Sequence, residues 1–186
     1  MKISNYNTYG FICIIYISCK KGSNETMNIR PIINNEIILL TDFLYEAIFQ
    51  KDANNLVPRT IIQDPSIWIY VNEFGSKKDD YCFVAELDKK IVGAVWVRCI
   101  KAFGHIDDDI PEFAISIYPQ YRGKGIGTAL MRKMLEYLHS KGYSKTSLAV
   151  QKDNYAAKMY QKVGFEILDE NEQEYIMICN LCNYAS

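Results

Sequence analysis

Apolar residues recur every three or four positions in two long segments, as they do along one face of an α-helix. In the first segment they are Ile37, Leu40, Leu44 and Ile48, and in the second Ile126, Leu130, Met134 and Leu138. We therefore predict helices over residues 34–49 and from about 126 to 140. Two shorter helices are expected, one over 66–74, between Asp64-Pro65 and Gly75, and one over 154–162.

Shorter apolar runs, several of them alternating with polar residues, predict strands. They cover residues 29–32, 81–87, 91–98, 113–117, 146–150, 165–168 and 174–181. The turn Asp88-Lys89-Lys90 joins two of them into a hairpin. The resulting order, β-α-α-β-β-β-α-β-α-β-β, contains two strand–helix–strand crossovers after an antiparallel start. This order predicts an α+β fold with a mixed sheet.

The composition is that of one globular domain. The chain has 186 residues, of which 49% are hydrophobic and 23% charged, enough to bury a sizeable core. Its formal net charge of −1 lacks the basic excess of a nucleic-acid-binding protein, so we expect no nucleic-acid partner.

The cysteines do not form a recognisable disulfide or metal pattern. There are six, irregularly spaced, and Cys82 and Cys99 lie within predicted strands. Cys179 and Cys182 form a C-x-x-C pair, but neither a second such pair nor a histidine pair accompanies it, as a zinc site requires. We therefore expect reduced thiols, no metal and a cytoplasmic protein.

The first 26 residues differ from the rest of the chain. The apolar run from Phe11 to Ile17 is too short to span a bilayer and resembles the core of a signal peptide. Against secretion, only Lys2 precedes the run, and Tyr16 stands where a lipoprotein signal has a small aliphatic residue. We expect residues 1–26 to be an extension, or translation to start at Met27, with the domain over 27–186 and no membrane association.

Three alternating glycines stand just before the helix predicted from residue 126. Gly123, Gly125 and Gly127 are interleaved with cations in the stretch "YPQYRGKGIGTALMRKMLEYL", residues 118–138. Because glycine costs roughly 1 kcal/mol in a helix interior, such a cluster marks a loop and a helix start. Bare backbone N–H groups at a helix N-terminus favour an anion such as phosphate.

The spacing excludes two common phosphate-binding motifs. A Walker A loop ends in Gly-Lys-Ser/Thr, and a dinucleotide fingerprint reads G-x-G-x-x-G, whereas this loop reads G-x-G-x-G. The pattern that fits is Gln/Arg-x-x-Gly-x-Gly/Ala, here Gln120-Tyr121-Arg122-Gly123-Lys124-Gly125. This stretch resembles the GNAT superfamily of acetyl-CoA-dependent N-acetyltransferases.

A second stretch, "NYAAKMYQKVGF", strengthens the resemblance. It matches the family pattern N-x-x-A-x-x-x-Y-x-x-x-G-F at Asn154, Ala157, Tyr160, Gly164 and Phe165. Both motifs occur in the family's order and separation, and the resemblance covers about residues 27–181. It implies a GNAT-like fold in which the fourth and fifth strands splay apart.

The resemblance also implies a cofactor site for acetyl-CoA, used as a co-substrate. The pyrophosphate would bind backbone N–H groups of the loop, the pantetheine arm would lie along the fourth strand, and Asn154 would hydrogen-bond the arm. The implied cofactor-binding residues are Ile115, Ser116, Ile117, Gln120, Tyr121, Arg122, Gly123, Lys124, Gly125, Ile126, Gly127, Thr128, Asn154 and Tyr160.

Transfer of an acetyl group to an amine requires a base, because most alkylamines are protonated near neutral pH. Glu112, at the start of the fourth strand, is the first candidate and Asp109 its rival; either can instead be a solvated carboxylate. By the resemblance, Tyr160 is the acid that protonates the departing thiolate, although a core tyrosine would occupy the same position.

Other polar and aromatic residues keep two interpretations. His105 is more often a surface residue than a base, and we leave it out of the site. The aromatic residues Tyr45, Phe49, Trp68 and Tyr70 either line the acceptor side or belong to the core.

The sequence therefore predicts an N-acetyltransferase acting on a primary amine of a small molecule or peptide. Clustered carboxylates at Asp107, Asp108, Asp109 and Glu112 favour a cationic acceptor. The alternatives are a catalytically silent acyl-CoA-binding module and an enzyme that acetylates proteins. The sequence leaves open whether the chain forms a homodimer.

Overall fold

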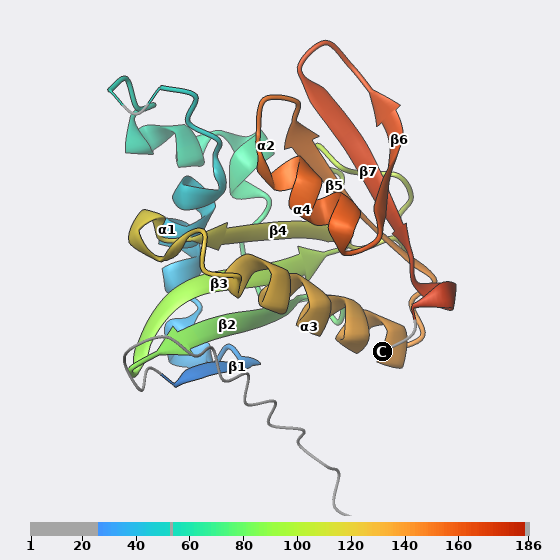
Figure 1. Ribbon diagram of the computed structural model, residues 1–186, viewed down its shortest axis with the longest axis horizontal. Helices are drawn as coiled ribbons and strands as arrows, with labels where there is room; N and C mark the ends of the chain where they lie inside the picture. The colour runs from blue at the N-terminus through green and yellow to red at the C-terminus, as the bar shows by residue number, and fades with distance from the viewer. Residues whose placement is uncertain (1–25, 53, 185–186) are drawn as a thin grey trace, which may run out of the picture.

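The computed structural model describes residues 26–184 except residue 53. The N-terminal extension predicted above lies outside these residues. One seven-stranded sheet with the order β1-β2-β3-β4-β5-β7-β6 forms the centre of the fold (Figure 1). The strands are β1 (Met27–Pro31), β2 (Tyr81–Leu87), β3 (Lys90–Arg98), β4 (Glu112–Ile117), β5 (Lys145–Gln151), β6 (Phe165–Glu170) and β7 (Glu174–Asn180).

Helices cover both faces of the sheet. α1 (Leu39–Ala47) and α2 (Pro65–Trp68) pack on one face, where Phe43 and Trp96 are completely buried. α3 (Ile126–Ser140) and α4 (Ala156–Lys162) pack on the other, over a larger apolar cluster. The predicted apolar stripe of α3, which includes Leu130 and Met134, faces this cluster.

The sheet opens between its fourth and fifth strands. β4 and β5 are parallel and pair through a single residue couple, Glu112 and Ser147, whereas β5 and β7 pair along their whole length. All the other neighbouring strands are antiparallel. The predicted mixed sheet with splayed central strands is therefore confirmed. Beyond Glu112, β4 remains paired with β3 but has no strand partner on the side that faces β5.

The first predicted helix is too long at both ends. The structure has a 3₁₀ turn over Asn34–Glu36 and an α-helix only from Leu39 to Ala47. The backbone N–H of Ile33 donates to the Glu36 carboxylate at 3.1 Å, and this bond caps the 3₁₀ turn. At the other end Ile48 is extended, with ψ 120°, and this turns the chain toward the sheet opening.

The second predicted helix, over 66–74, is also wrong in length, because α2 ends at Trp68. The buried guanidinium of Arg98 explains the early end. Its Nη1 donates to the carbonyl oxygens of Ile69 and Asn72, at 2.8 and 2.7 Å, and so takes acceptors that a continued helix would use. The predicted boundaries of all seven strands agree with the structure to within two residues.

The described residues contain neither a membrane-spanning helix nor a cluster of metal-binding side chains. Within residues 26–184, apart from 53, no helix is long and apolar enough to cross a bilayer. In the same part of the chain, no three or more His, Cys, Asp or Glu side chains group together as metal ligands would.

Candidate active site

The glycine loop (residues 122–128) presents bare backbone N–H groups at the start of α3. Gly123 and Gly125 have φ angles of +74° and +81°, which residues with a Cβ rarely adopt. A Cβ on either glycine would meet no atom of the described residues within 4 Å, so these residues leave the space beside the loop open. Within the described chain, no N–H group of residues 123–128 donates to a backbone carbonyl. The loop and the positive end of α3 therefore suit an anionic group such as phosphate.

The two cations of the glycine loop are engaged by other protein groups. Arg122 donates from Nε to the carbonyl oxygen of Ile117 at 2.8 Å and from Nη2 to the carboxylate of Glu46 at 3.1 Å. The ammonium group of Lys124 lies 5.5 Å from the centre of the Tyr121 ring. The backbone N–H groups of the loop, more than these two side chains, are therefore available to bind an anion.

A cleft of about 370 Å³ runs from the glycine loop along β4 to α4, and we call it the glycine-loop cleft. The predicted residues that line it are Ile115, Ser116, Ile117, Arg122, Gly123, Gly125, Gly127, Thr128, Asn154 and Tyr160. Those predicted residues that do not line it are Gln120, Tyr121, Lys124 and Ile126. Ile126 instead packs in the core beneath α3.

Two predicted side chains in the cleft are occupied by local hydrogen bonds. The Ser116 hydroxyl donates to the carbonyl oxygen of Phe43 at 2.7 Å, so Ser116 offers the cleft mainly its backbone. The side-chain oxygen of Asn154 accepts from the N–H of Ala156 at 2.9 Å, at the start of α4. This bond leaves the amide nitrogen of Asn154 as the donor available to a ligand.

A second cavity of about 240 Å³ lies on the α1 and α2 side of the sheet opening, and we call it the apolar cavity. Its walls include Ile48, Ile67, Tyr70, Phe103 and Val150. Polar groups come from Gln151, Asn154, Tyr160 and Glu174. Among the described residues that line it, Glu174 is the one charged side chain.

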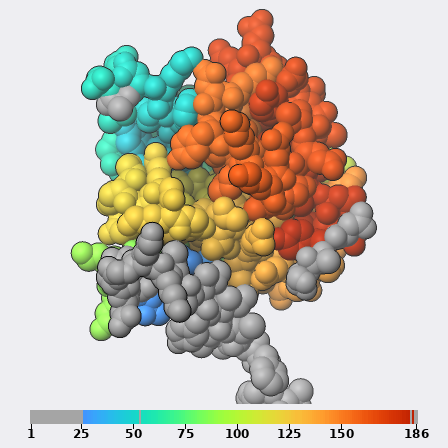
Figure 2. Space-filling view, in the orientation of Figure 1, coloured from blue at the N-terminus to red at the C-terminus, as the bar shows by residue number. Residues whose placement is uncertain are grey.

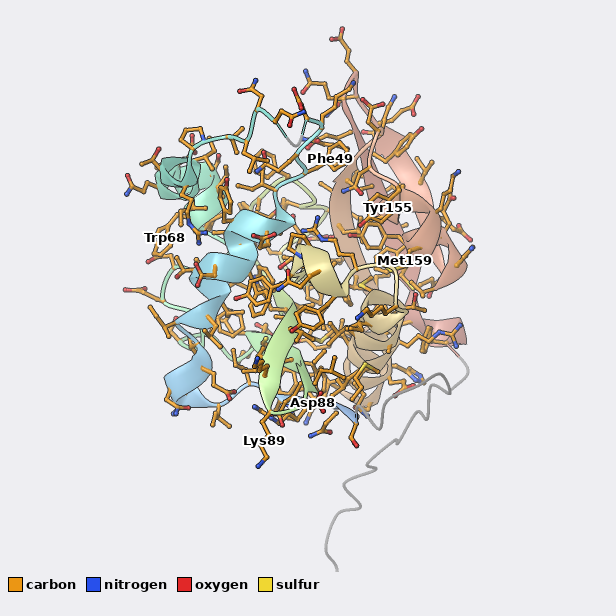
Figure 3. The ribbon with its side chains drawn as sticks, turned by 60° about the vertical axis from the view of Figure 1, so that its left-hand side comes forward. Phe49, Trp68, Asp88, Lys89, Tyr155 and Met159 are labelled. Atoms are coloured by element: carbon orange, nitrogen blue, oxygen red, sulfur yellow. The ribbon has the colours of Figure 1, made fainter. Side chains whose placement is uncertain are left out.

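The two cavities meet at a common wall. The residues that line both are Ala47, Ile48, Phe49, Ile115, Asn154 and Tyr160. Figure 2 shows the segment after α1, the glycine loop and α4 meeting on one face of the molecule, in cyan, yellow and orange. In Figure 3, Phe49 lies on the α1 side of this region, and Tyr155 and Met159 lie on the α4 side. A ligand bound in the glycine-loop cleft would thus face a ligand in the apolar cavity.

Glu112 is buried behind the apolar cavity and does not line it. Its side chain accepts hydrogen bonds at Oε1 from the Tyr70 hydroxyl and from the N–H of Gly104, the latter at 2.8 Å. Its Oε2 is buried and has no hydrogen-bond partner among the described residues. Tyr70 lines the cavity and its hydroxyl bonds to Glu112, so this residue connects the cavity with the carboxyl group.

Burial gives Glu112 the titration behaviour of a base. Removal from water raises the pKa of its carboxyl group to about 7, and the negative charge of Glu174 adds to the increase. The hydrogen bonds from Tyr70 and Gly104 act in the opposite direction. Near neutral pH the group can therefore both accept and release a proton, as a general base must.

Tyr160 lies at the common wall of the two cavities and is 8% exposed. Burial raises the pKa of its phenol, and the nearby Tyr155 adds to this. The hydroxyl therefore stays protonated at neutral pH. It can therefore donate a hydrogen bond to a group that carries negative charge at the junction.

The acidic loop before β4 lies apart from both cavities. Asp107, Asp108 and Asp109 are exposed and line neither cavity. Asp108 forms an ion pair with Lys101 at 3.3 Å, and His105 lies 3.7 Å from the same carboxylate. The loop carboxylates are therefore not placed to contact a ligand in the apolar cavity.

Sequence reasoning missed several residues that the fold brings to the site. Tyr70 was left with two interpretations, whereas Phe103, Gly104 and Glu174 were not considered. A Cβ on Gly104 would lie 2.7 Å from the carbonyl carbon of Leu148, so only glycine fits there. In the sequence, the one signal for this close approach was that Gly104 is a glycine in the loop before a predicted strand.

The family follows from a comparison with protein-family models. The model described as the acetyltransferase (GNAT) family matches residues 46–165 of this chain. The chain therefore belongs to the acetyltransferase (GNAT) family, and the predicted family is confirmed. The match includes Glu112, the glycine loop and Tyr160.

Curated relatives match over about half of this chain. N-acetylaspartate synthetase of Xenopus tropicalis is 36% identical over 99 residues, which cover 52% of this chain and 35% of that protein. An uncharacterized N-acetyltransferase of Methanocaldococcus jannaschii is 35% identical over 92 residues, covering 48% of this chain and 41% of that protein. The chain thus matches less than half the length of these relatives.

A solved structure shows the same fold. The PaiA N-acetyltransferase from Thermoplasma acidophilum, in complex with coenzyme A, has a TM-score of 0.62 and 19% sequence identity to this chain. The match covers 83% of this chain and 98% of that chain. At this identity the likeness supports the fold, and the predicted GNAT-like fold is confirmed.

Proposed function

We propose that this chain is an N-acetyltransferase that moves the acetyl group of acetyl-CoA to a primary amine of a small molecule or peptide. One observation carries the proposal. Two cavities meet at a common wall, with an anion-binding glycine loop in one and a buried tyrosine–carboxyl pair behind the other. That arrangement suits a reaction between an anionic donor and an amine.

The glycine-loop cleft fits the CoA part of the donor. The N–H groups of residues 123–128 would bind the pyrophosphate, and the unpaired side of β4 would bind the amides of the pantetheine arm. The remaining donor of Asn154 would bind the same arm. Arg122 has a positioning role, because its bonds to Ile117 and Glu46 connect the loop with β4 and α1.

Glu112 would act as the base through Tyr70. The Tyr70 oxygen accepts a proton from the ammonium group of the acceptor as its own hydroxyl proton passes to Glu112. The amine becomes neutral, Tyr70 remains a phenol, and Glu112 becomes a neutral carboxylic acid. This relay follows from the position of Tyr70 between the cavity and the carboxyl group.

Tyr160 would stabilise the leaving thiolate. The neutral amine attacks the acetyl carbonyl carbon, the C–N bond forms, and the C–S bond breaks. The Tyr160 hydroxyl gives its proton to the sulfur and becomes a phenolate. The nitrogen, which carries one surplus proton after the C–N bond has formed, then gives that proton to the phenolate and restores the phenol. Glu112 later releases its proton to solvent, so one proton is lost in each turnover.

Two measurements test the proposal. Calorimetry should show that the protein binds acetyl-CoA, and an amine panel should release free CoA together with an amine heavier by one acetyl group. A catalytically silent acyl-CoA-binding module would bind acetyl-CoA and release no CoA with any amine or protein. Failure to bind acetyl-CoA would contradict the proposed function itself.

We also propose a reducing, cytoplasmic setting for the protein. The four cysteines in the described part of the chain are free thiols, and Cys82 and Cys179 are buried. Burial raises the pKa of the Cys179 thiol to about 11, which keeps it unreactive. Mass spectrometry of the protein from its native cells, after alkylation without reductant, tests whether these thiols stay reduced.

A further inference from the structure

From the lining of the apolar cavity we infer that the acceptor is a small monoamine with an apolar, preferably aromatic, body and no carboxylate. The inference rests on the proposed function and names its substrate class. It depends on the chemistry of the cavity wall and not on the acidic loop before β4.

The cavity wall suits a hydrocarbon body. Ile48, Ile67 and Val150 supply branched apolar surface, while Phe49, Tyr70 and Phe103 supply aromatic faces. Tyr70 and Phe103 are stacked, with ring centres 6.4 Å apart and planes inclined by 12°. Each apolar group buried against such a wall contributes roughly 25 cal/mol per Å². The walls therefore favour an acceptor with a compact hydrophobic group.

The charge of the wall selects among amines. Glu174 is half-buried, and within the described residues its carboxylate forms no ion pair. It can therefore attract one ammonium group. Among the described residues, no Lys, Arg or His lines the cavity, so an acceptor carboxylate would be buried without a cationic partner and beside a like charge. Amino acids that keep a free carboxylate are thus disfavoured.

The small volume of the apolar cavity and its single carboxylate disfavour long polyamines and peptides as acceptors. The cavity volume of about 240 Å³ lies below the usual range of roughly 300–1,000 Å³ for drug-sized ligands. A second ammonium group of a polyamine would lie against apolar walls, because Glu174 can neutralise one cation only. A small monoamine satisfies both limits.

The decisive experiment compares acceptors that differ in one group. Phenethylamine and phenylalanine share the same body and differ by a carboxylate, while spermidine, aspartate and a tetrapeptide with an N-terminal phenylalanine complete the panel. CoA release and product mass are measured for each acceptor. We expect kcat/KM for phenethylamine to exceed that for each of the others at least about a hundredfold, as expected for an unpaired buried charge.

The role of Glu174 is tested with two variants and a matched control. Glu174→Gln should raise the KM for phenethylamine about fivefold and leave kcat nearly unchanged, because a screened charge pair typically contributes about 1 kcal/mol. Glu174→Arg should reverse the preference between phenylalanine and phenethylamine. Glu170→Gln removes a carboxylate from the same hairpin, outside the cavity, and should change neither.

Binding of phenethylamine to the protein saturated with CoA, measured by calorimetry, provides a readout independent of turnover. Binding that is about fivefold weaker in Glu174→Gln supports the inference. Equal or better acetylation of spermidine, an amino acid or the peptide overturns the inference and leaves the proposed function standing. Acetyl-CoA binding without acetylation of phenethylamine also overturns it. Absence of acetyl-CoA binding overturns both.

Discussion

The hydroxyl of Tyr70 donates a hydrogen bond to Oε1 of Glu112, although the two residues are 42 positions apart in the sequence. Tyr70 follows α2, and Glu112 begins β4. Both are buried, and Tyr70 alone of the two contacts the apolar cavity. Tyr70 therefore connects the proposed base with the apolar cavity, and the properties of the pair can be tested by varying the pH and by removing single atoms.

The first prediction concerns stability and pH. The folded protein keeps a proton on Glu112 up to a pKa of about 7, whereas the ordinary value is 4.5. Between these values the folded state binds more protons than the unfolded chain. This carboxyl group therefore favours folding fully below about pH 4.5, and its contribution is lost as the pH rises through 7.

A pKa difference of this size corresponds to roughly 3 kcal/mol. Urea unfolding at pH 5 and pH 8 should therefore show a smaller fall in the free energy of unfolding for Glu112→Gln than for the natural protein. The amide stays neutral at both pH values, so this contribution disappears. An equal fall in both proteins would mean that Glu112 does not titrate as proposed.

The second prediction concerns the proton relay. Tyr70→Phe keeps the ring and removes the hydroxyl between the cavity and Glu112. Because base catalysis typically contributes about a hundredfold or more, kcat/KM should fall by about that factor, and the loss should be largest at low pH. The matched control is Tyr143→Phe, which removes a hydroxyl that donates to the Asp79 carboxylate outside both cavities.

Tyr143→Phe should retain normal kcat/KM. If Tyr70→Phe also retains it while Glu112→Gln does not, the proton reaches Glu112 by a route that bypasses Tyr70.

The third prediction concerns Gly104, which lies between Glu112 and β5. A Cβ there would lie 2.7 Å from the carbonyl carbon of Leu148 and 2.8 Å from the amide nitrogen of Ala149. Backbone atoms cannot move aside as side-chain ends can, so Gly104→Ala should lower the free energy of unfolding by about 1–3 kcal/mol. Gly127→Ala is the comparison, because its Cβ would meet only the ends of Ile117 and Met159. A smaller effect at Gly104 than at Gly127 would contradict this argument.

The sequence was most informative where the chemistry is local. The glycine loop and the motif at Asn154 and Tyr160 are short contiguous patterns, and both reach the same cleft in the structure. The Tyr70–Glu112 pair depends instead on how α2 and β4 pack, and on the capture of carbonyl groups by Arg98 that shortens α2. Residue periodicity contains no information about such long-range contacts.

Charge patterning was the least reliable guide. The run Asp107-Asp108-Asp109 indicated a cationic acceptor, but these side chains are exposed and line neither cavity. The carboxylate that does line the apolar cavity, Glu174, is isolated in the sequence and reaches the site because β7 pairs with β5. Sheet order, which the sequence pattern does not specify, decides which acidic residue lines the apolar cavity.

The fourth prediction concerns the glycine loop. Gly125→Glu would place a carboxylate where the pyrophosphate is proposed to bind and should weaken acetyl-CoA binding in calorimetry at least about a hundredfold. Gly142→Glu is a closely matched control. Gly125 and Gly142 have φ angles of +81° and +83°, and a Cβ on either would have no atom of the described part of the chain within 4 Å. Gly142, however, lies beyond the end of α3.

Both substitutions should therefore cost a similar 1–2 kcal/mol in stability, from left-handed backbone strain. Only Gly125→Glu should lose acetyl-CoA. Equal affinities in the two variants would remove the glycine loop from the proposed cofactor site.

The last prediction separates chemistry from binding at Tyr160. Its hydroxyl is buried at the common wall of the two cavities, and burial keeps it protonated by raising its pKa. Tyr160→Phe preserves the ring that packs near Phe165, with ring centres 6.2 Å apart, so the fold and acetyl-CoA affinity should hardly change. Without the proton donor, kcat should fall about a hundredfold or more at every pH between 6 and 9.

Tyr137→Phe, on α3 and outside both cavities, should leave kcat unchanged. If Tyr160→Phe retains full kcat with unchanged acetyl-CoA affinity, Tyr160 is a packing residue and another group protonates the thiolate. If instead its kcat falls equally with a more acidic thioester leaving group, the hydroxyl acts before the C–S bond breaks, because an acid that assists departure matters less when the thiolate is more stable.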